Sequence, residues 1–298
     1  KPNWHRIMRK YANEFNLADA EYCVLGTLVN HSALTRKQFE ESAFEAIWAG
    51  SMGICTALGY PDADIVTMSE FLDAARVLNR STNIPVIADC NSGYGSIHNV
   101  IRMVKEYENA GIAAICIEDQ VFPKKNSFYS GTNDLEETNL FCEKLSAAVQ
   151  AREDSKFMII ARIEALVAGR DVTEALDRAY AYKLAGADMI AIHSKSKTPD
   201  EIIRFLESWA SKTLVMVIPT TYYLSIEQLK ALKVSIVVYA NQALRAIVPS
   251  VKQLLTQISD HPGDINIPSH RIADLDEIFQ LHQLNSWNYF SRDQTTKK

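Results

Sequence analysis

The sequence lacks the features that would direct it to a membrane or a nucleic acid. No stretch approaches the roughly 18 consecutive apolar residues of a membrane-spanning helix, and residues 1–5 lack the apolar core of a signal peptide. The 31 basic and 36 acidic residues are interspersed, so no basic patch indicates binding to nucleic acid or to an anionic membrane. We therefore expect a soluble, cytoplasmic protein that binds a small molecule.

Cysteine pairs with metal-binding or redox spacing are also missing. The number of cysteines is odd, none forms a CxxC pair, and several lie in or beside apolar runs, which is typical of buried thiols in a reducing compartment. A GxGxxG turn, the mark of a dinucleotide-binding sheet, does not follow the first apolar run. The five cysteines are Cys23, Cys55, Cys90, Cys116 and Cys142.

Short apolar runs, rich in β-branched residues, alternate with longer segments at helical spacing. This alternation is typical of βα units around a parallel sheet whose strands are covered on both faces. The chain has 298 residues, enough for one large barrel domain or two ordinary domains. Eight runs are predicted strands, at residues 22–28, 46–49, 85–89, 113–118, 158–162, 189–193, 214–219 and 234–239.

Amphipathic segments between these runs predict helices, most clearly at 97–110, 136–152, 171–185 and 200–211. An open, doubly wound sheet would give a similar alternation. Eight units at roughly 30-residue spacing, without a nucleotide-binding turn, favour a single α/β domain instead, a (β/α)8 TIM-type barrel. We expect this catalytic barrel to occupy residues 1–260.

Residues 261–298 are expected to form a C-terminal helical extension. Residues 274–284 predict an amphipathic helix with Leu275, Ile278, Phe279 and Leu281 on one half of its surface. Two interpretations are open: the helix packs on a neighbouring subunit, or it covers its own barrel.

Polar side chains follow six of the predicted strands. The carboxyl ends of barrel strands form one rim, where enzymes of this architecture hold their active sites. These strand-end residues are Asp89 and Asn91 after the third run, Glu118 after the fourth, Arg162 and Glu164 after the fifth, His193 after the sixth, Thr220 after the seventh, and Asn241 after the eighth.

The residue types at this rim suit the binding of a metal ion and an anion. Asp89 and Glu118 offer carboxylate oxygens, and Mg²⁺ usually binds one or two carboxylates with waters and substrate oxygens. Arg162 presents a planar fork of donors for carboxylate or phosphate, and His193 can donate to a phosphoryl or enolate oxygen. Small residues in 48–53 allow backbone N–H groups to approach an anion. Helix caps, ion pairs, a structural histidine and a plain turn are the alternative interpretations.

In the order of its motifs, the chain resembles the phosphoenolpyruvate mutase branch of the isocitrate lyase superfamily. The resemblance extends from about residue 34 to residue 251. It rests on the segments 47–48, 58–62, 89–95, 118–127, 161–165, 193–195, 219–223 and 240–241.

The loop after the fourth strand distinguishes the branches of this superfamily. The lyase branch carries a Lys-Arg-Cys-Gly-His loop, whereas this chain has Lys124-Lys125-Asn126-Ser127. Mutases carry the same lysine, asparagine and serine, and the phosphonopyruvate hydrolases lack the asparagine. The resemblance therefore implies a phosphoenolpyruvate phosphonomutase, an isomerase that moves the phosphoryl group of phosphoenolpyruvate from O2 to C3.

The resemblance also implies a set of site residues and a cofactor. Mg²⁺ would be held by Asp89, Asn91 and Glu118. A lid over residues 122–133 would exclude water, and exchange of the C-terminal helix would give a homodimer or homotetramer. The implied catalytic residues are Asp62, Lys124, Asn126, Ser127, Arg162 and His193, and the implied substrate-binding residues are Trp48, Gly50, Ser51, Met52, Asp89, Glu164, Thr220 and Asn241.

Three positions depart from the mutase pattern. Asn91 replaces a second aspartate, Gln120 replaces a lysine, and Gly50-Ser51 replaces a Ser-Gly pair. Two alternatives follow. One is a phosphonopyruvate hydrolase, or a C–C lyase or hydrolase of a related 2-oxo acid, on the same scaffold. The other is a non-catalytic barrel in which Asn91 marks a lost metal site.

Overall fold

The computed structural model describes the backbone of residues 23–27 and residues 44–129, 131, 133–209, 212–263 and 272–281. Some predicted features lie outside these ranges. They are residues 1–22 and 28–43 of the predicted barrel domain, which include the ends of the first predicted strand, residues 130 and 132 of the predicted lid, the helix end at 210–211, and the segments 264–271 and 282–298 of the C-terminal extension.

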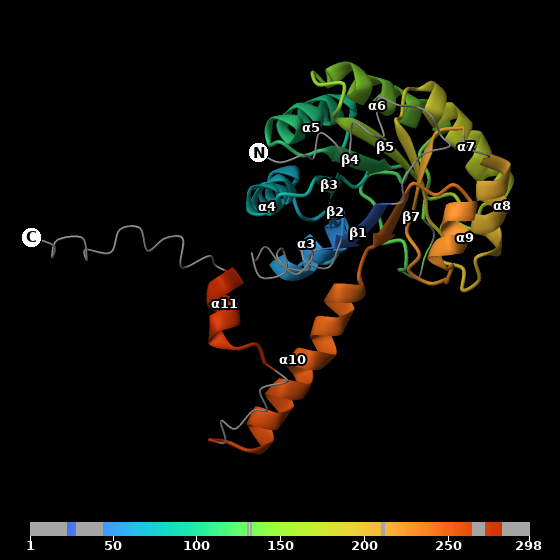
Figure 1. The fold of residues 1–298 in the computed structure, drawn as a ribbon. Helices are drawn as coiled ribbons and strands as arrows, with labels where there is room; N and C mark the ends of the chain where they lie inside the picture. The colour runs from blue at the N-terminus through green and yellow to red at the C-terminus, as the bar shows by residue number, and fades with distance from the viewer. Residues whose placement is uncertain are drawn as a thin grey trace, which may run out of the picture.

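Eight parallel strands form a closed barrel in sequence order, with β1 paired to β8 (Figure 1). The predicted (β/α)8 barrel is therefore confirmed. The strands are β1 Cys23–Thr27, β2 Ala46–Ala49, β3 Val86–Asp89, β4 Ala114–Glu118, β5 Met158–Ile163, β6 Met189–Ile192, β7 Leu214–Val217 and β8 Ile236–Tyr239.

Helices surround the barrel on its outer face (Figure 1). The four helices predicted between strands are present as α5 Ile97–Asn109, α6 Thr138–Ala151, α7 Val172–Leu184 and α8 Asp200–Trp209. The α4 helix begins with a capping box, in which the Thr67 side chain accepts from the backbone N–H of Glu70 and Glu70 accepts from that of Thr67. The remaining helices are α3 Ser51–Leu58, α4 Met68–Ser81, α9 Ile226–Ala231, α10 Gln242–Asp260 and α11 Leu275–Leu281.

Strand alternation separates two buried layers. In β5, Ile159, Ala161 and Ile163 pack in the layer between barrel and helices. Met158 and Ile160 pack in the second layer, inside the barrel, and Arg162 continues that inward row. The same alternation puts Trp48 on the inward side of β2. Inward side chains at the carboxyl ends of the strands therefore converge on one mouth.

The C-terminal helices extend away from the barrel (Figure 1). The predicted amphipathic helix is present from Leu275, and Leu275 is 72% exposed. Along α10, Val248, Val251, Leu255 and Ile258 are also exposed. In the described part of the chain, no helix combines the length and hydropathy needed to cross a membrane.

Candidate active site

A pocket of about 490 Å³, part of it open to solvent, lies at the carboxyl ends of the strands. Thirteen of the sixteen predicted site residues line it, so the rim predicted from the sequence is a real concavity. Phe128, Ile218 and Ala240 line it as well and were not predicted. The predicted residues in its wall are Trp48, Gly50, Ser51, Met52, Asp62, Asp89, Lys124, Asn126, Ser127, Arg162, His193, Thr220 and Asn241.

The other three predicted residues, Asn91, Glu118 and Glu164, are buried behind the wall, each with no more than 1% of its surface exposed. Glu118 and Glu164 both contact Arg162. Asn91 contacts Asp64 instead.

Arg162 is the centre of the buried polar cluster. Its Nε donates to Glu164 Oε1 at 2.5 Å, and its Nη2 donates to Ser127 Oγ at 3.1 Å. Its Nη1 lies 3.2 Å from Glu118 Oε2 and 3.8 Å from Asp89 Oδ2. The register of the barrel explains this convergence, because Glu118 and Arg162 are direct partners across β4 and β5. The guanidinium is therefore fixed in the floor of the pocket.

His193 is oriented by the same guanidinium. Arg162 Nη2 lies 3.0 Å from His193 Nδ1, and Glu164 Oε1 lies 3.2 Å from the same nitrogen. The contact with Arg162 requires a lone pair on Nδ1, whereas the contact with Glu164 requires a proton on the same nitrogen. Arginine can only donate, so we assign Nδ1 as the acceptor and place the proton on Nε2. Nε2 is buried and has no hydrogen-bond partner among the described residues.

The electrostatics of the cluster follow from burial and charge pairing. Burial lowers the pKa of His193 below its ordinary value, although Glu164 acts against this shift, and the ring is neutral. Burial alone would raise the pKa of Glu164, but the charge of Arg162 and the hydrogen bond from Ser127 hold it well below its usual range. Burial raises the pKa of Glu118, despite the opposing effects of Lys124 and Arg162. Burial thus favours the neutral form of Glu118, and an additional cation nearby would favour its ionised form.

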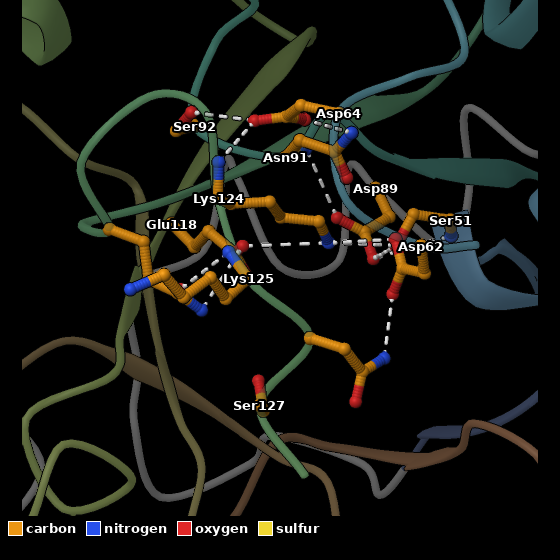
Figure 2. Close-up of polar contacts among 12 residues, drawn as sticks. Ser51, Asp62, Asp64, Asp89, Asn91, Ser92, Glu118, Lys124, Lys125 and Ser127 are labelled. Carbon is orange, nitrogen blue, oxygen red and sulfur yellow. Dashed lines mark hydrogen bonds and ion pairs between the residues drawn. The ribbon is translucent and has the colours of Figure 1, made fainter. Parts of the chain in front are cut away.

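Lys124 carries a second buried charge into the pocket (Figure 2). Its Nζ lies 3.2 Å from Asp62 Oδ1 and 3.5 Å from Glu118 Oε1, and it donates to Ser51 Oγ at 3.1 Å. Ser51 Oγ in turn donates to Asp89 Oδ2 at 3.0 Å. Burial alone would lower the pKa of Lys124, but Glu118 and Asp62 raise it, so the ammonium group stays charged.

The loop of residues 122–129, which we call the lid, closes over the pocket from two sides. Asn126 Nδ2 donates to Asp62 Oδ2 at 2.9 Å on one side. Ser127 Oγ donates to Glu164 Oε2 at 2.7 Å on the other. The Phe128 ring then lies edge-on to His193, with 5.4 Å between ring centroids. The lid side chains therefore face the Arg162 and His193 donors across the pocket.

Asp64 contacts two of the predicted site residues, Asn91 and Lys124, and was not itself predicted. Its Oδ1 accepts from Asn91 Nδ2 at 2.7 Å, and its Oδ2 accepts from the backbone N–H of Lys124 at 2.6 Å (Figure 2). Burial raises its pKa, against the hydrogen bond from Lys124. The available signal was a second carboxylate two residues after Asp62, in a segment already assigned to the site.

The comparisons with known proteins agree with this geometry. The family model for phosphoenolpyruvate phosphomutase matches residues 21–259. The chain belongs to the phosphoenolpyruvate phosphomutase family. It lies within the larger superfamily that includes the isocitrate lyases, as the sequence motifs predicted.

Members of the phosphoenolpyruvate phosphomutase family with different reactions are similar to this chain. A phosphonopyruvate hydrolase of Variovorax sp. (strain Pal2) is 40% identical over 254 residues, which is 84% of this chain and 87% of the relative. The crystal structure of a phosphoenolpyruvate phosphomutase from Streptomyces platensis subsp. rosaceus matches with a TM-score of 0.87 and 40% identity, covering 91% of this chain and 94% of that one. A phosphonopyruvate hydrolase in complex with oxalate and Mg²⁺ also matches with a TM-score of 0.87, at 34% identity, covering 99% and 100% of the two chains.

The residues predicted to hold a metal in this phosphomutase-family chain fit a hard, hydrated cation. Among the described residues, no group of three or more His, Cys, Asp or Glu side chains could enclose an ion. Mg²⁺ needs less, because one or two carboxylates and several waters suffice. Asp89 and Glu118 both approach Arg162 Nη1, so they face a common point. Asn91 Oδ1 is buried and has no hydrogen-bond partner among the described residues, as expected of an oxygen that is available to a cation, whereas Glu118 Oε2 is paired with Arg162 Nη1 at 3.2 Å.

Gln120, the second departure from the mutase pattern, contacts both Glu118 and the lid. Its Nε2 lies 3.5 Å from Glu118 Oε1, and its Oε1 accepts from the backbone N–H of Lys125 at 3.2 Å. A neutral amide can serve both groups at once because it carries a donor and an acceptor.

Asp119 is another residue that the sequence did not reveal. Its Oδ1 accepts from the backbone N–H of Glu164 at 2.8 Å. Its Oδ2 accepts from Tyr182 Oη at 2.6 Å and from Arg178 Nη1 at 3.1 Å. This buried cluster joins α7 to the strand end that holds Glu164, so it sets the position of Glu164 and, through it, of Arg162.

Proposed function

We propose that the protein is a phosphoenolpyruvate phosphonomutase, an isomerase that interconverts phosphoenolpyruvate and phosphonopyruvate. The observation that carries this proposal is the placement of Asn126 in the pocket wall, where its amide is held by Asp62. The mutase pattern has this asparagine, and the hydrolase pattern lacks it. The membership of the chain in the family supports the substrate class.

The proposed step transfers the phosphoryl group within one molecule. The P–O2 bond of phosphoenolpyruvate breaks, and its electron pair stays on O2 of the pyruvate enolate. C3 of the enolate then forms the P–C bond, and no proton or water is consumed. Such a transfer depends on positioning and on stabilising charge on the migrating group.

The residues of the pocket are placed to do both. Arg162 and the His193 Nε2–H supply donors to the phosphoryl oxygens, and Ser127 and Asn126 supply donors from the lid. The backbone N–H groups of residues 50–52 would receive the substrate carboxylate, with Trp48, Thr220 and Asn241 completing the wall.

Mg²⁺ is the proposed cofactor, held by Asp89 and Glu118 with Asn91 close by. The chemistry it supplies when bound is charge stabilisation at the carboxylate and O2 of the enolate. The complex of a related hydrolase with oxalate and Mg²⁺ supports this assignment, because oxalate resembles the pyruvate enolate.

Exclusion of water decides the outcome of the reaction. A water molecule that captured the migrating phosphoryl group would give phosphate and pyruvate instead. The lid contacts of Asn126 and Ser127 and the packing of Phe128 against His193 close the pocket on that side. Hydrolysis of phosphonopyruvate is the second candidate function, favoured by the 40% identity with a hydrolase of that substrate.

Phosphorus NMR of the protein with phosphonopyruvate and Mg²⁺ tests the proposal. Phosphoenolpyruvate is the expected product, because the phosphate ester is the more stable of the two. Inorganic phosphate with pyruvate would establish the hydrolase instead. His193→Asn is the control for contaminating activity, since it keeps an acceptor for Arg162 and removes the Nε2–H donor.

We also propose that residues 261–298 form an oligomerisation extension of the barrel domain, 1–260, giving a homodimer or homotetramer. Exposed apolar residues on α10 and α11, among them Val251, Leu255 and Phe279, support this arrangement. Light scattering coupled to size-exclusion chromatography measures the subunit number, and a monomer at micromolar concentration would contradict the proposal.

A further inference from the structure

The interaction between Asn91 and Asp64 concerns a strand-end position at which this chain lacks a negative charge of the mutase pattern. Asn91 stands where the mutase pattern has an aspartate, and its side chain is bonded to a carboxylate 27 residues earlier in the chain. The negative charge that is missing at residue 91 is therefore present at residue 64, one hydrogen bond away, at 2.7 Å.

The backbone shows that this pairing is built into both loops. Asp64 and Asn91 have φ angles of 55° and 51°, a left-handed conformation that costs free energy for residues other than glycine. Asparagine and aspartate tolerate it best because their short side chains can hydrogen-bond locally. The two loops thus present an amide and a carboxylate to each other in fixed directions.

Asp64 also determines which way the Asn91 amide faces. An ionised carboxylate only accepts, so the atom of Asn91 that faces Asp64 is the nitrogen. The amide oxygen is then turned to the opposite side, toward Asp89 (Figure 2). Asn91 is fully buried, and its Oδ1 has no hydrogen-bond partner among the described residues. A buried, unpartnered acceptor beside Asp89 points to a ligand, and the ligand that suits it is a hydrated cation.

The same carboxylate is tied to the lid. Asp64 Oδ2 accepts from the backbone N–H of Lys124 at 2.6 Å and from Ser92 Oγ at 3.4 Å. Three donors, from Asn91, Ser92 and Lys124, therefore converge on Asp64 from two segments of the chain. Lys124 is held through its backbone here and through its ammonium group at Asp62.

We propose that Asp64 is a positioning residue for the metal site, supplying the carboxylate that residue 91 lacks and turning the Asn91 oxygen toward the cation. The carboxylate lies on one loop and the amide on the other, and the pair acts on metal-bound water as a unit. This inference rests on the proposed function for its cofactor, Mg²⁺. It also gives the departure at Asn91 a role other than the loss of the metal site.

The reciprocal exchange tests the inference by metal binding. Mn²⁺ affinity is measured by electron paramagnetic resonance, with Mg²⁺ as competitor, for the wild type, Asp64→Asn and Asp64→Asn/Asn91→Asp. Asp64→Asn keeps the shape and removes the charge, so Mn²⁺ binding should weaken by about 10- to 100-fold, as for other residues that support metal ligands. The double variant restores the carboxylate–amide pair in reverse order and should recover most of that loss.

Controls separate a local effect from a general one. Asp73→Asn makes the same chemical change at a side chain on α4 that is 73% exposed, and it should leave Mn²⁺ affinity unchanged. Thermal unfolding of each variant shows whether Asp64→Asn folds, and the double variant preserves the test if the single one does not.

The outcomes distinguish this inference from the proposed function. Equal Mn²⁺ affinity of wild type and Asp64→Asn, or no recovery in the double variant, overturns the role of Asp64 even if the enzyme is a mutase. Absence of Mn²⁺ binding by the wild type overturns it as well. If the wild type releases phosphate from phosphonopyruvate while Mn²⁺ affinity follows the exchange, the mutase assignment fails and the role of Asp64 stands.

Discussion

Arg162 Nη2 lies 3.0 Å from His193 Nδ1, and with Nδ1 assigned as the acceptor of this contact the histidine proton is on Nε2. Arginine has no acceptor and keeps its charge, so the tautomer is set by the guanidinium and not by the pH of the solution. The consequence is a neutral histidine that donates from Nε2.

Removal of that donor tests its role in turnover. His193→Asn keeps an oxygen that can accept from Arg162 but does not reach the Nε2 position. Loss of one preorganised donor costs about 100- to 1,000-fold in kcat in comparable sites, and we expect a drop of this order with a smaller change in KM. His193→Gln, which can present a donor near Nε2, should retain more activity. Steady-state kinetics with phosphonopyruvate compare the two, and equal losses would show that the Nε2 donor has no special role.

Stability should depend on pH through the same residue. Burial lowers the pKa of His193, so the unfolded chain takes up a proton at a higher pH than the native protein does. The free energy of unfolding should therefore fall as pH drops below about 6.5, the ordinary value for histidine. Urea unfolding without divalent cations, between pH 8 and pH 5.5, should show a shallower dependence in His193→Asn. Identical slopes would mean that other groups cause the effect.

The contacts of Asp119 predict that it contributes to the free energy of unfolding as well as to the position of Glu164. Asp119→Asn leaves an acceptor for the Glu164 backbone N–H but removes the charge that faces Arg178. Breaking a buried ion pair from one side costs about 3–5 kcal/mol of unfolding free energy. Glu174→Gln is the matched control because Glu174 pairs with the same arginine from a side chain that is 38% exposed, and exposed pairs contribute about 1 kcal/mol or less. Chemical denaturation measures both, and equal costs would contradict the distinction.

The contacts of the lid predict that it controls which product is formed. Asn126→Ala removes the hydrogen bond to Asp62 and opens one side of the closed pocket to water. We expect the share of phosphate among the products to rise relative to phosphoenolpyruvate, measured by phosphorus NMR. Lys125→Ala is the control, because this neighbouring lid residue has a side chain that is 49% exposed and pairs with Asp134 outside the pocket. It should leave the ratio of the products unchanged. An unchanged product ratio in Asn126→Ala would show that the lid does not control water access.

The sequence predicted the barrel because its strands are covered on both faces. Such strands are almost continuously apolar, and all eight were located to within two residues at either end. The sequence analysis named no helix at α3, α4, α9 or α10, and of these α3 and α9 have only eight and six residues. Segments of this length hold too few turns for a helical period to be distinguished from a loop.

The site was predicted where it follows from strand alternation and motif order, and missed where it depends on contacts between loops. Asp89, Glu118 and Arg162 end inward-facing rows, so their convergence follows from the barrel itself. Asp64 meets Asn91 across 27 residues, and Asp119 meets Arg178 across 59. Pairing of this kind depends on the path of the loops, which composition and period do not encode. Asn91 illustrates the difference, since the sequence marked it as a departure and the fold provides its partner.

The double attachment of Lys124 has a consequence for the way ligands enter. The backbone of Lys124 is tied to Asp64 and its ammonium group to Asp62 and Glu118, while Arg162 balances Glu118 and Asp89. Without ligands, the carboxylates of the pocket already have cations belonging to the protein. A divalent metal alone would meet those cations, and an anionic substrate alone would meet those carboxylates. When metal and substrate bind together, the carboxylates of the pocket can pair with the metal and the protein cations with the substrate, with almost no change in the total charge. The pocket therefore favours joint binding of metal and substrate over binding of either one separately.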